Sequence, residues 1–508
     1  MYDAIIIGAG VGGLSCAAKL ANQGKKVLIV EKIHHIGGTS HIFKRMNNGR
    51  YFFPMGPLSF SHPDKVRNML NEMGIESEIG FKQSHFQLIT PEIDIIYSQP
   101  WTRFQKKLIQ RFPEDSKGIK QFFNELNKVI KAIHHVEEWH PDFTLNAIQK
   151  FPSDSIPKKY KNDYDIIEQY SNISSKDILN KYLSNSTLKK LLGSQGTYEP
   201  VMNMVHLAFM WNVMSIKGIW YPSIGIHGIN EQLENSILQN GGEILLNSPV
   251  KEILIEDRKA VGIEIEEFKV FNAPWVVSNA DYKTTFLDLL DTTKVPFDHL
   301  QTVQNSAYTG SELCVYLGAK GDEIDLSNLR AEHIFYRKNM KPPSPEEKVA
   351  FDKKEIEICV WSEKEPKSAP EGMISLILRT NMDFDHFHSW RTGVKQRKEG
   401  YGEYKQKLAK ALIKVVDTII PGILGAHTIV DIATPLTYLD WGKRYRGSIA
   451  GWSRDLEKIT GFKRKVLVKT PIDHLLAVGI YSYLEPFLGG YPVSMHSGKI
   501  AAEYIEKN

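Results

Sequence analysis

The chain has 508 residues, with 63 Lys and Arg against 59 Asp and Glu, which gives a formal net charge of +4. A hydrophobic fraction of 42% and a charged fraction of 24% are those of an ordinary globular protein and exclude a disordered chain. The small positive excess gives no reason to expect a nucleic-acid partner. At about 150 residues per domain, the length predicts two or three domains or one large composite one.

Cysteine usage and hydropathy narrow the class further. Cys16, Cys314 and Cys359 are too widely spaced for a disulfide framework or a cysteine-rich zinc site. No stretch of about 18 uninterrupted apolar residues is present, so the sequence predicts no membrane-spanning helix. Residues 1–21 are apolar, but they lack a basic leading segment and are interrupted by glycines, so we expect them to belong to the fold. These features predict a cytoplasmic protein.

The first predicted elements are a strand and a helix joined by glycines. Residues 2–7 form an apolar run typical of a buried parallel strand, and Gly8, Gly10 and Gly13 follow in the pattern G-x-G-x-x-G. Apolar residues then recur at helical spacing as far as Gly24. In such units the first glycine makes a tight turn, the second admits a pyrophosphate and the third lets helix pack on strand. The helix N-terminus offers free N–H groups to the phosphates.

A second apolar run over residues 27–30 ends in Glu31, which lies 21 residues after Gly10. An acid at this place accepts hydrogen bonds from an adenosine ribose. A lone glycine motif is a weak signal, but here the strand, glycines, helix, second strand and terminal acid occur in order. The beginning of the chain is therefore predicted to bind a dinucleotide.

The residues after Glu31 indicate which dinucleotide it is. They read E-x-x-x-x-I-G-G-T and include Gly37, Gly38 and Thr39. This stretch resembles the extended motif of FAD-containing amine oxidases, phytoene desaturases and their relatives. The resemblance implies FAD as the cofactor, with the glycine pair close to its ribityl and flavin portion. Residues 193–196 lack the spacing, preceding strand and acid of a second fingerprint, so no nicotinamide domain is expected.

Later segments resemble the same superfamily. Residues 221–228 resemble its Y-P-K-G-G loop, and residues 276–281 resemble its strand end V-V-S-N-A-D. The resemblance also implies that the backbone at Val250 pairs with the adenine edge. Alternating patterns and a charged turn predict short strands between these segments, at about 243–247, 249–256, 259–265 and 268–272.

The C-terminal part carries a further signature. Residues 474–479 form an apolar strand that ends in Gly479, and Gly490 and Tyr491 open the final helix. The resemblance implies that Gly479 faces the ribityl-diphosphate and that residues 490–492 place backbone and a helix N-terminus against the flavin. A helix dipole there would stabilise negative charge on the reduced flavin.

The middle third, about residues 76–215, is predicted to be mainly helical. Trp101, Phe104, Leu108 and Phe112 share one helical face that basic residues flank. A basic amphipathic helix with aromatic anchors can lie on a membrane surface. Any surface helix that packs on the body of a protein has the same pattern, so both interpretations stay open.

Further segments point to one branch of the superfamily. Residues 111–114, and the pair of segments 434–437 and 446–452, resemble blocks of the carotenoid isomerase and retinol saturase branch. Between them, residues 401–419 predict a long amphipathic helix that ends before Pro421. This branch acts on long polyenes, which implies a long apolar lipid or polyene as the substrate.

Two polar clusters contain residue types that bind metal ions. Neither has a spacing with a known mechanism, so no metal is predicted. The clusters are His134, His135, Glu138 and His140, and Asp383, Asp385, His386 and His388.

The predicted fold class is α/β: a discontinuous Rossmann-type FAD-binding domain with an inserted α+β substrate domain. The first comprises residues 1–75, 216–290 and 460–508, and the second comprises residues 76–215 and 291–459. The predicted FAD-binding residues are Gly8, Gly10, Gly12, Gly13, Glu31, Lys32, Gly37, Gly38, Thr39, Ser40, Val250, Gly479, Gly490 and Tyr491.

The predicted function is that of an FAD-dependent oxidoreductase or isomerase acting on a long apolar isoprenoid, which it extracts at a membrane surface. Desaturation, isomerisation and saturation of carbon–carbon double bonds use nearly the same visible residues, and no catalytic residue is predicted. One alternative is a flavin amine oxidase, which shares the flavin motifs. Another is a non-catalytic prenyl-lipid-binding protein of the Rab-escort type, which has no need of the intact glycine motifs.

Overall fold

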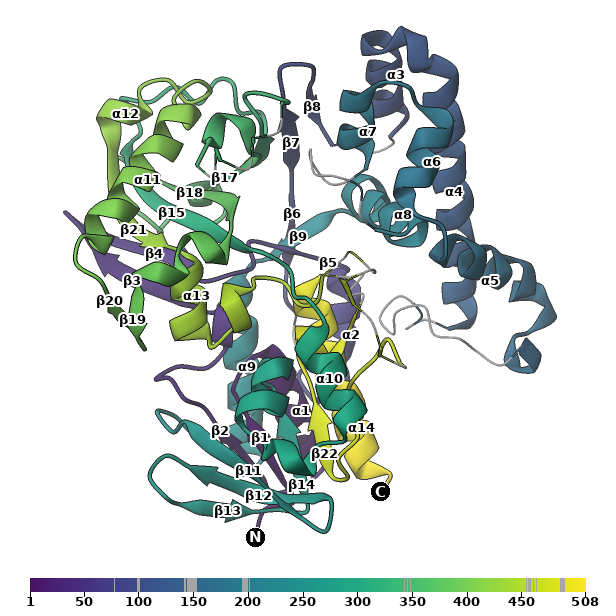
Figure 1. Cartoon of the computed structure of the whole chain (residues 1–508), viewed down its shortest axis with the longest axis vertical. Helices are drawn as coiled ribbons and strands as arrows, with labels where there is room; N and C mark the ends of the chain where they lie inside the picture. Colours follow the sequence, from purple (N-terminus) through teal and green to yellow (C-terminus); the bar gives the residue numbers. More distant parts are fainter. Residues whose placement is uncertain are drawn as a thin grey trace.

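The computed structural model describes residues 1–508 except 77, 98–100, 141–142, 144–152, 194–199, 201, 342, 345, 348, 454, 456–457, 460, 463 and 485–488. It has a lower part built on a parallel sheet, and an upper part in which a second sheet lies beside a group of helices (Figure 1). Both termini lie at the lower end of this view. The predicted α/β class is confirmed.

The lower sheet is parallel and has five strands in the order β10-β2-β1-β14-β22. This is the 3-2-1-4-5 order of dinucleotide-binding sheets. The strands come from three distant parts of the chain. They are short, mostly apolar segments, as expected for parallel strands that are buried on both faces. Their bounds are β1 (Ala4–Ile7), β2 (Val27–Val30), β10 (Glu243–Leu245), β14 (Trp275–Ser278) and β22 (Leu475–Ala477).

Alternating side chains of this sheet supply two cores. Ile6 and Ile29 face the helices α1 (Val11–Asn22), α9 (Gly225–Gln239) and α14 (Gly490–Glu506). Ile5 and Leu28 face a three-stranded antiparallel sheet on the other side. That sheet consists of β11 (Val250–Glu256), β12 (Lys259–Ile265) and β13 (Val270–Asn272). The strands predicted after residue 243 are therefore confirmed, with small shifts of their ends.

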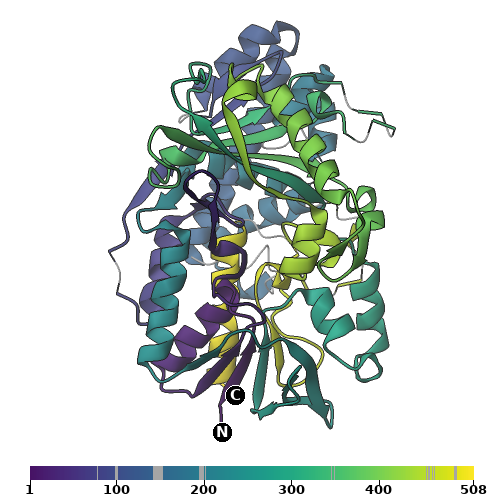
Figure 2. The same ribbon diagram turned by 90° about the vertical axis from the view of Figure 1, so that its left-hand side faces the viewer.

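The upper sheet has seven strands in the order β21-β15-β18-β17-β16-β7-β8, and its neighbours are antiparallel except for β16 and β7. One face packs on α11 (Tyr401–Val416), and the other faces the lower part of the molecule (Figure 2). The strands are β7 (Phe86–Ile89), β8 (Asp94–Ile96), β15 (Ser311–Lys320), β16 (His333–Tyr336), β17 (Ile356–Val360), β18 (Met373–Met382) and β21 (His427–Ala433).

The helical group has an apolar core of its own. It contains α3 (Thr102–Arg111), α4 (Ser116–Trp139), α5 (Lys158–Ser171), α6 (Ser175–Tyr182), α7 (Ser186–Leu192) and α8 (Met204–Asn212). Trp101, Phe104, Leu108 and Phe112, the face considered for a membrane, are all buried in this core. The structure thus supports the interpretation that α3 packs on the protein body. Among the helices that are described, none has an apolar stretch long enough to cross a bilayer.

Shorter elements join these parts. The hairpin β3 (Ile42–Met46) and β4 (Arg50–Pro54) extends below the upper sheet, and β5 (Phe60–Ser61), β6 (Phe81–Ser84) and β9 (Ile219–Pro222) form a small antiparallel sheet. Helix α13 spans Pro435–Gly442, and β19 (Arg391–Gly393) pairs with β20 (Gln396–Arg397) in a two-stranded sheet.

Candidate functional site

A cavity of about 1520 Å³ lies where the two sheets meet. This is larger than the roughly 300–1,000 Å³ of ordinary small-molecule sites. The ends of β1, β2 and β14, the N-termini of α1 and α14, the inner face of the upper sheet, and the helices α8 and α13 all contribute to its wall. Ligands bind at this place in open α/β sheets, beyond the carboxyl ends of the parallel strands.

The glycine loop after β1 forms one end of the cavity. Gly8 has a φ of +93°, which an L side chain adopts only under strain. Helix α1 begins after Gly10, and within the described chain no side chain caps it, so its first N–H groups stay available. A side chain at Gly12 would place its Cβ 2.7 Å from the backbone nitrogen of Gly479. Two segments at opposite ends of the sequence therefore approach each other here.

Of the fourteen predicted FAD-binding residues, Gly13 does not line the cavity. A Cβ at Gly13 would collide with the carbonyl oxygen of Gly8, so this glycine faces β1. That position suits the third glycine of the motif, whose task is close packing of helix on strand. The other thirteen line the wall: Gly8, Gly10, Gly12, Glu31, Lys32, Gly37, Gly38, Thr39, Ser40, Val250, Gly479, Gly490 and Tyr491.

Glu31 lies at the carboxyl end of β2 and is 5% exposed. Its carboxylate accepts hydrogen bonds from the backbone N–H of Ala9, at 2.7 Å, and of Ile33, at 3.1 Å. These bonds hold the glycine loop against the turn after β2. A carboxylate offers about four lone-pair positions, so Glu31 retains capacity for hydroxyl groups of a ligand.

The glycine pair after Glu31 turns the chain back along the loop. Gly37 has a φ of +88° and donates its N–H to the carbonyl of Ala9 at 2.7 Å. The hydroxyl of Thr39 accepts a bond from Arg444 at 3.0 Å. The carbonyl of Ser40 accepts a bond from Asn230 at 2.8 Å. The segment is therefore fixed at both ends along the cavity wall.

Lys32 points to the opposite side of the cavity. Its Nζ donates to the carbonyl of Gly442, at the end of α13, at 3.0 Å. Burial lowers the pKa of Lys32 to about 8, because a charged amine loses hydration there. The lowered pKa means that the protonated amine of Lys32 is less stable than in water, and an anion in the cavity would stabilise this protonated form.

The C-terminal segment supplies another wall. Gly479 has a φ of +95°, and its N–H donates to the hydroxyl of Ser497 at 2.7 Å. Helix α14 begins at Gly490, and the described residues provide no side-chain cap for it. The hydroxyl of Tyr491 donates to Asn230 at 3.1 Å, and its ring stacks on Phe60 with centroids 5.1 Å apart. A second helix N-terminus with free N–H groups thus borders the cavity.

Four residues that organise this wall were not among the predicted site residues, although two of them, Asn279 and Asp281, belong to the segment 276–281 that resembles the superfamily. Asn279 lies over Gly10, and the buried Asp281 accepts a bond from the hydroxyl of Tyr308 at 2.7 Å. Their place at the carboxyl end of a predicted parallel strand was a usable signal. Asn230 and Arg444 come from a helix and a turn that have no such signal.

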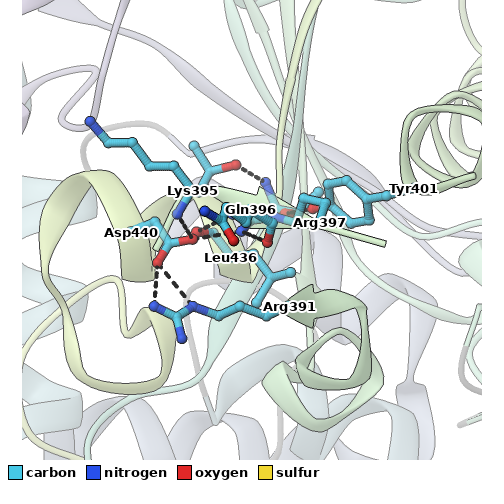
Figure 3. Close-up of polar contacts among 9 residues, drawn as sticks. Arg391, Lys395, Gln396, Arg397, Tyr401, Leu436 and Asp440 are labelled. Atoms are coloured by element: carbon cyan, nitrogen blue, oxygen red, sulfur yellow. Dashed lines mark hydrogen bonds and ion pairs between the residues drawn. The ribbon is translucent and has the colours of Figure 1, made fainter. Parts of the chain in front are cut away.

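Helix α13 is anchored through a buried carboxylate (Figure 3). Asp440 accepts bonds from Arg391 at 2.9 and 3.0 Å and from Arg397 at 2.7 Å. It also accepts from the backbone N–H of Lys395 at 3.2 Å. Burial alone raises the pKa of Asp440, but the bonds from the two arginines lower it below its ordinary value. The hairpin β19–β20 therefore holds α13 in place as part of the cavity wall.

The other end of the cavity is largely apolar. His206, Met210 and Val213 line it from one face of α8 and the turn after it, which continues as a π-helix over Val213–Lys217. Such turns are frequent at functional sites. Further apolar side chains come from β3, β9 and the upper sheet. Four charged residues of that sheet also line the cavity: Glu312, Glu357, Arg379 and Asp431, the last of which pairs with Arg45 at 2.7 Å.

The residues considered for a metal engage other partners. His134 bonds to Asn212, and His135 bonds to Asp163 at 2.6 Å. Asp385 pairs with Arg446. Across the described ranges, no group of three or more His, Cys, Asp or Glu side chains has an arrangement that would hold a metal ion.

Comparisons with known proteins agree with this geometry. The model of the family "flavin containing amine oxidoreductase" matches residues 11–331, more than half of the chain. Chloroplastic prolycopene isomerase 1 of an Oncidium hybrid cultivar is 24% identical over 94% of this chain and 80% of its own length. All-trans-retinol 13,14-reductase of Danio rerio is 24% identical over 98% and 85%. The 1-hydroxycarotenoid 3,4-desaturase of Flavobacterium sp. (strain P99-3) is 25% identical over 99% of both chains.

Solved structures share the fold. An oxidoreductase from Methanosarcina mazei superposes with a TM-score of 0.61 at 15% identity, over 99% of this chain and 100% of that one. The uncapped N-termini of α1 and α14, the loop of Gly8 and Gly10, and the carboxylate of Glu31 fit the phosphate, flavin and ribose groups of FAD. The chain belongs to the flavin containing amine oxidoreductase family and is an FAD-dependent oxidoreductase.

Proposed function

We propose that this protein acts on carbon–carbon bonds of a long apolar isoprenoid polyene, by desaturation, cis–trans isomerisation or saturation. The observation that carries the proposal is the cavity, which joins the glycine loop at one end to an apolar wall at the other. A substrate in the apolar end would lie beside a flavin held at the loop. When bound, FAD supplies hydride or electron transfer at its isoalloxazine ring.

In this proposal the protein's own residues position both molecules. The N-terminus of α1 binds the pyrophosphate, and Glu31 accepts bonds from the ribose hydroxyls. The N-terminus of α14 lies against the flavin. The side chains of α8 and the upper sheet exclude water and hold the polyene in a fixed orientation.

The substrate class is inferred from the relatives together with the cavity. A prolycopene isomerase, a retinol reductase and a hydroxycarotenoid desaturase all match over most of the chain. Their names describe three reactions on one kind of molecule, so the shared element is the conjugated isoprenoid. We therefore propose the substrate class and leave the direction of the reaction to the experiment.

We propose that one domain binds FAD and that the other binds the substrate. Residues 1–75, 216–290 and 460–508 make up the FAD-binding domain, and residues 76–215 and 291–459 make up the substrate domain. Because a polyene partitions into lipid, we include contact with a membrane surface in the proposal. The apolar face of α3 does not serve this contact, since its side chains are buried.

The test is the visible absorption spectrum of the freshly purified protein, with mass spectrometry of its organic extract. Oxidised-flavin bands together with a co-extracted isoprenoid polyene are the expected result. Flavin bands with an extract free of isoprenoids, and release of hydrogen peroxide when a panel of primary amines is added, would show an amine oxidase instead. A protein that takes up no flavin even after FAD is added would contradict the enzymatic function.

A further inference from the structure

A row of charged side chains crosses the apolar end of the cavity. Arg379 of β18 is the direct partner of Glu357 on β17 and of Cys314 on β15. Glu312 lies two residues before Cys314, so it projects from the same face of the sheet. Glu312, Arg379 and Glu357 thus lie side by side on three neighbouring strands, and all three line the cavity.

Arg379 and Glu312 do not form a hydrogen bond with each other. The closest approach of Arg379 to Glu312 is 3.9 Å, and each side chain is only 12% exposed. One N–H of Arg379 binds the carbonyl of Gly56 at 2.6 Å, while its buried Nε–H, which is 3.9 Å from Glu312, makes no hydrogen bond in the described part of the chain. Glu312 accepts a bond from Tyr438 at 2.6 Å. An arginine has five N–H donors and a carboxylate about four acceptor positions, so capacity for a ligand remains on both.

Stability of the fold does not explain such a row. Buried ion pairs are weak stabilisers, and replacing them with apolar side chains is often neutral or favourable. The opposite face of the same strands packs on α11 through apolar side chains such as Leu313, Val315 and Leu378, so charge is not needed for packing on that side. The row instead places charges beside apolar side chains of the same sheet, such as Tyr316 and Ala433, that also line the cavity.

The charges of the row favour a neutral ligand group. Burial raises the pKa of Glu312, while Arg379 and the bond from Tyr438 act to lower it. Burial also acts to raise the pKa of Glu357, but a hydrogen bond from His333 at 2.6 Å lowers it to about 2, so Glu357 stays ionised. This carboxylate would repel an anionic ligand, and Arg379 would repel a cationic one. A hydroxyl group accepts from a guanidinium and donates to a carboxylate at once, as this row requires.

We propose that Glu312 and Arg379 bind a hydroxyl group at one end of the isoprenoid substrate, with Glu357 and Tyr438 holding them in place. The inference rests on the proposed function and adds the end group to it. The hydroxyl would fix how far the chain enters the cavity and therefore which bond lies beside the flavin.

The test measures dissociation constants of the FAD-loaded protein for four diterpenoid ligands, from the change of the flavin spectrum or of tryptophan fluorescence. The ligands share one geranylgeranyl chain and end in a hydroxyl, a methyl, a carboxylate or an amine. We expect the alcohol to bind at least about tenfold more tightly than the hydrocarbon, the effect of one or two hydrogen bonds. Glu312→Gln and Tyr438→Phe should remove most of this preference, measured as the ratio of the dissociation constants for the hydrocarbon and the alcohol.

Glu332→Gln is the matched control. Glu332 is 13% exposed and lies 3.8 Å from the cation of Lys364, but it is outside the cavity wall. The Glu332→Gln variant should keep the preference of the protein for the alcohol over the hydrocarbon. FAD stoichiometry and circular dichroism check the folding of each variant.

The outcomes separate two failures. Equal affinity of wild-type protein for the alcohol and the hydrocarbon, or tighter binding of the carboxylate or the amine, overturns the assignment of the row and leaves the proposed function standing. If the FAD-loaded protein binds neither the alcohol nor the hydrocarbon, the isoprenoid function fails, and this inference fails with it.

Discussion

Gly12 lies where the first turn of α1 meets the segment after β22. A methyl group at this position would lie 2.7 Å from the nitrogen and 3.0 Å from the Cα of Gly479, and 2.9 Å from the side-chain oxygen of Asn279. Ordinary contacts of a carbon begin near 3.5 Å, so Gly12→Ala would push the backbone of Gly479 back by about 0.8 Å. Overpacking of this kind costs about 1–3 kcal/mol.

That strain should appear mainly in cofactor binding. We expect FAD to contact both α1 and Gly479, so FAD binding should require the native spacing between these two segments. A cost of about 1–3 kcal/mol corresponds to an increase of about 5- to 150-fold in the dissociation constant for FAD. The assay titrates cofactor-free protein with FAD and follows quenching of flavin fluorescence, while thermal unfolding of the same samples reports the strain without ligand.

Gly402→Ala is the control for this prediction. Gly402 lies in the first turn of α11, has a helical φ, and would place its Cβ in open space. Alanine there should leave FAD affinity unchanged and stabilise the helix by up to about 1 kcal/mol. Unchanged FAD affinity and thermal stability of Gly12→Ala would refute the reasoning, because they would mean that the two segments are not held at the spacing described.

Two further predictions concern charges at the cavity. Because the pKa of Lys32 is lowered to about 8 and a bound pyrophosphate would raise it, FAD binding takes up a proton and its affinity should fall as pH rises through about 8. Lys32→Arg, which stays charged, should abolish this dependence, and a wild-type affinity that is constant between about pH 7 and about pH 9 would contradict it. Asp440→Asn leaves Arg391 and Arg397 without a counter-charge and should destabilise the protein by about 2 kcal/mol at neutral pH, less than for fully buried pairs because Arg391 is 31% exposed. Since the folded-state pKa of Asp440 is lowered, this difference should be present at neutral pH and shrink below about pH 4, and thermal melts at a series of pH values measure it.

Local patterns predicted much of the lower half of the fold. The apolar runs at residues 2–7 and 27–30 became strands β1 and β2, because a strand buried on both faces has a distinctive composition. Helix α11 begins at Tyr401 as predicted but ends at Val416, three residues before the predicted end, because its last residues form turns before Pro421. The seven-stranded sheet was not predicted, since its strands pair over long separations that no local pattern reports.

The site likewise contains residues that local patterns predicted and residues that they did not. Gly8, Gly10 and Glu31 were predicted because the short strand–helix–strand unit that carries them imposes its own spacing. Arg379 and Glu312 were not predicted, because two isolated charges in apolar strands become neighbours only through the register of β15 and β18. Amphipathic spacing alone did not settle the role of α3, since it cannot distinguish a protein core from a lipid surface.

We predict that the protein changes the number or configuration of double bonds in an isoprenoid polyene. The most direct test incubates the FAD-loaded protein anaerobically with poly-cis and all-trans polyenes in liposomes, once with oxidised and once with reduced flavin, and analyses the products by chromatography and mass spectrometry. A change in the number or configuration of double bonds, absent from wild-type protein from which FAD has been removed, is the predicted result. Unchanged polyenes under both conditions, with flavin reduction by an amine in the same preparation, would contradict the claim.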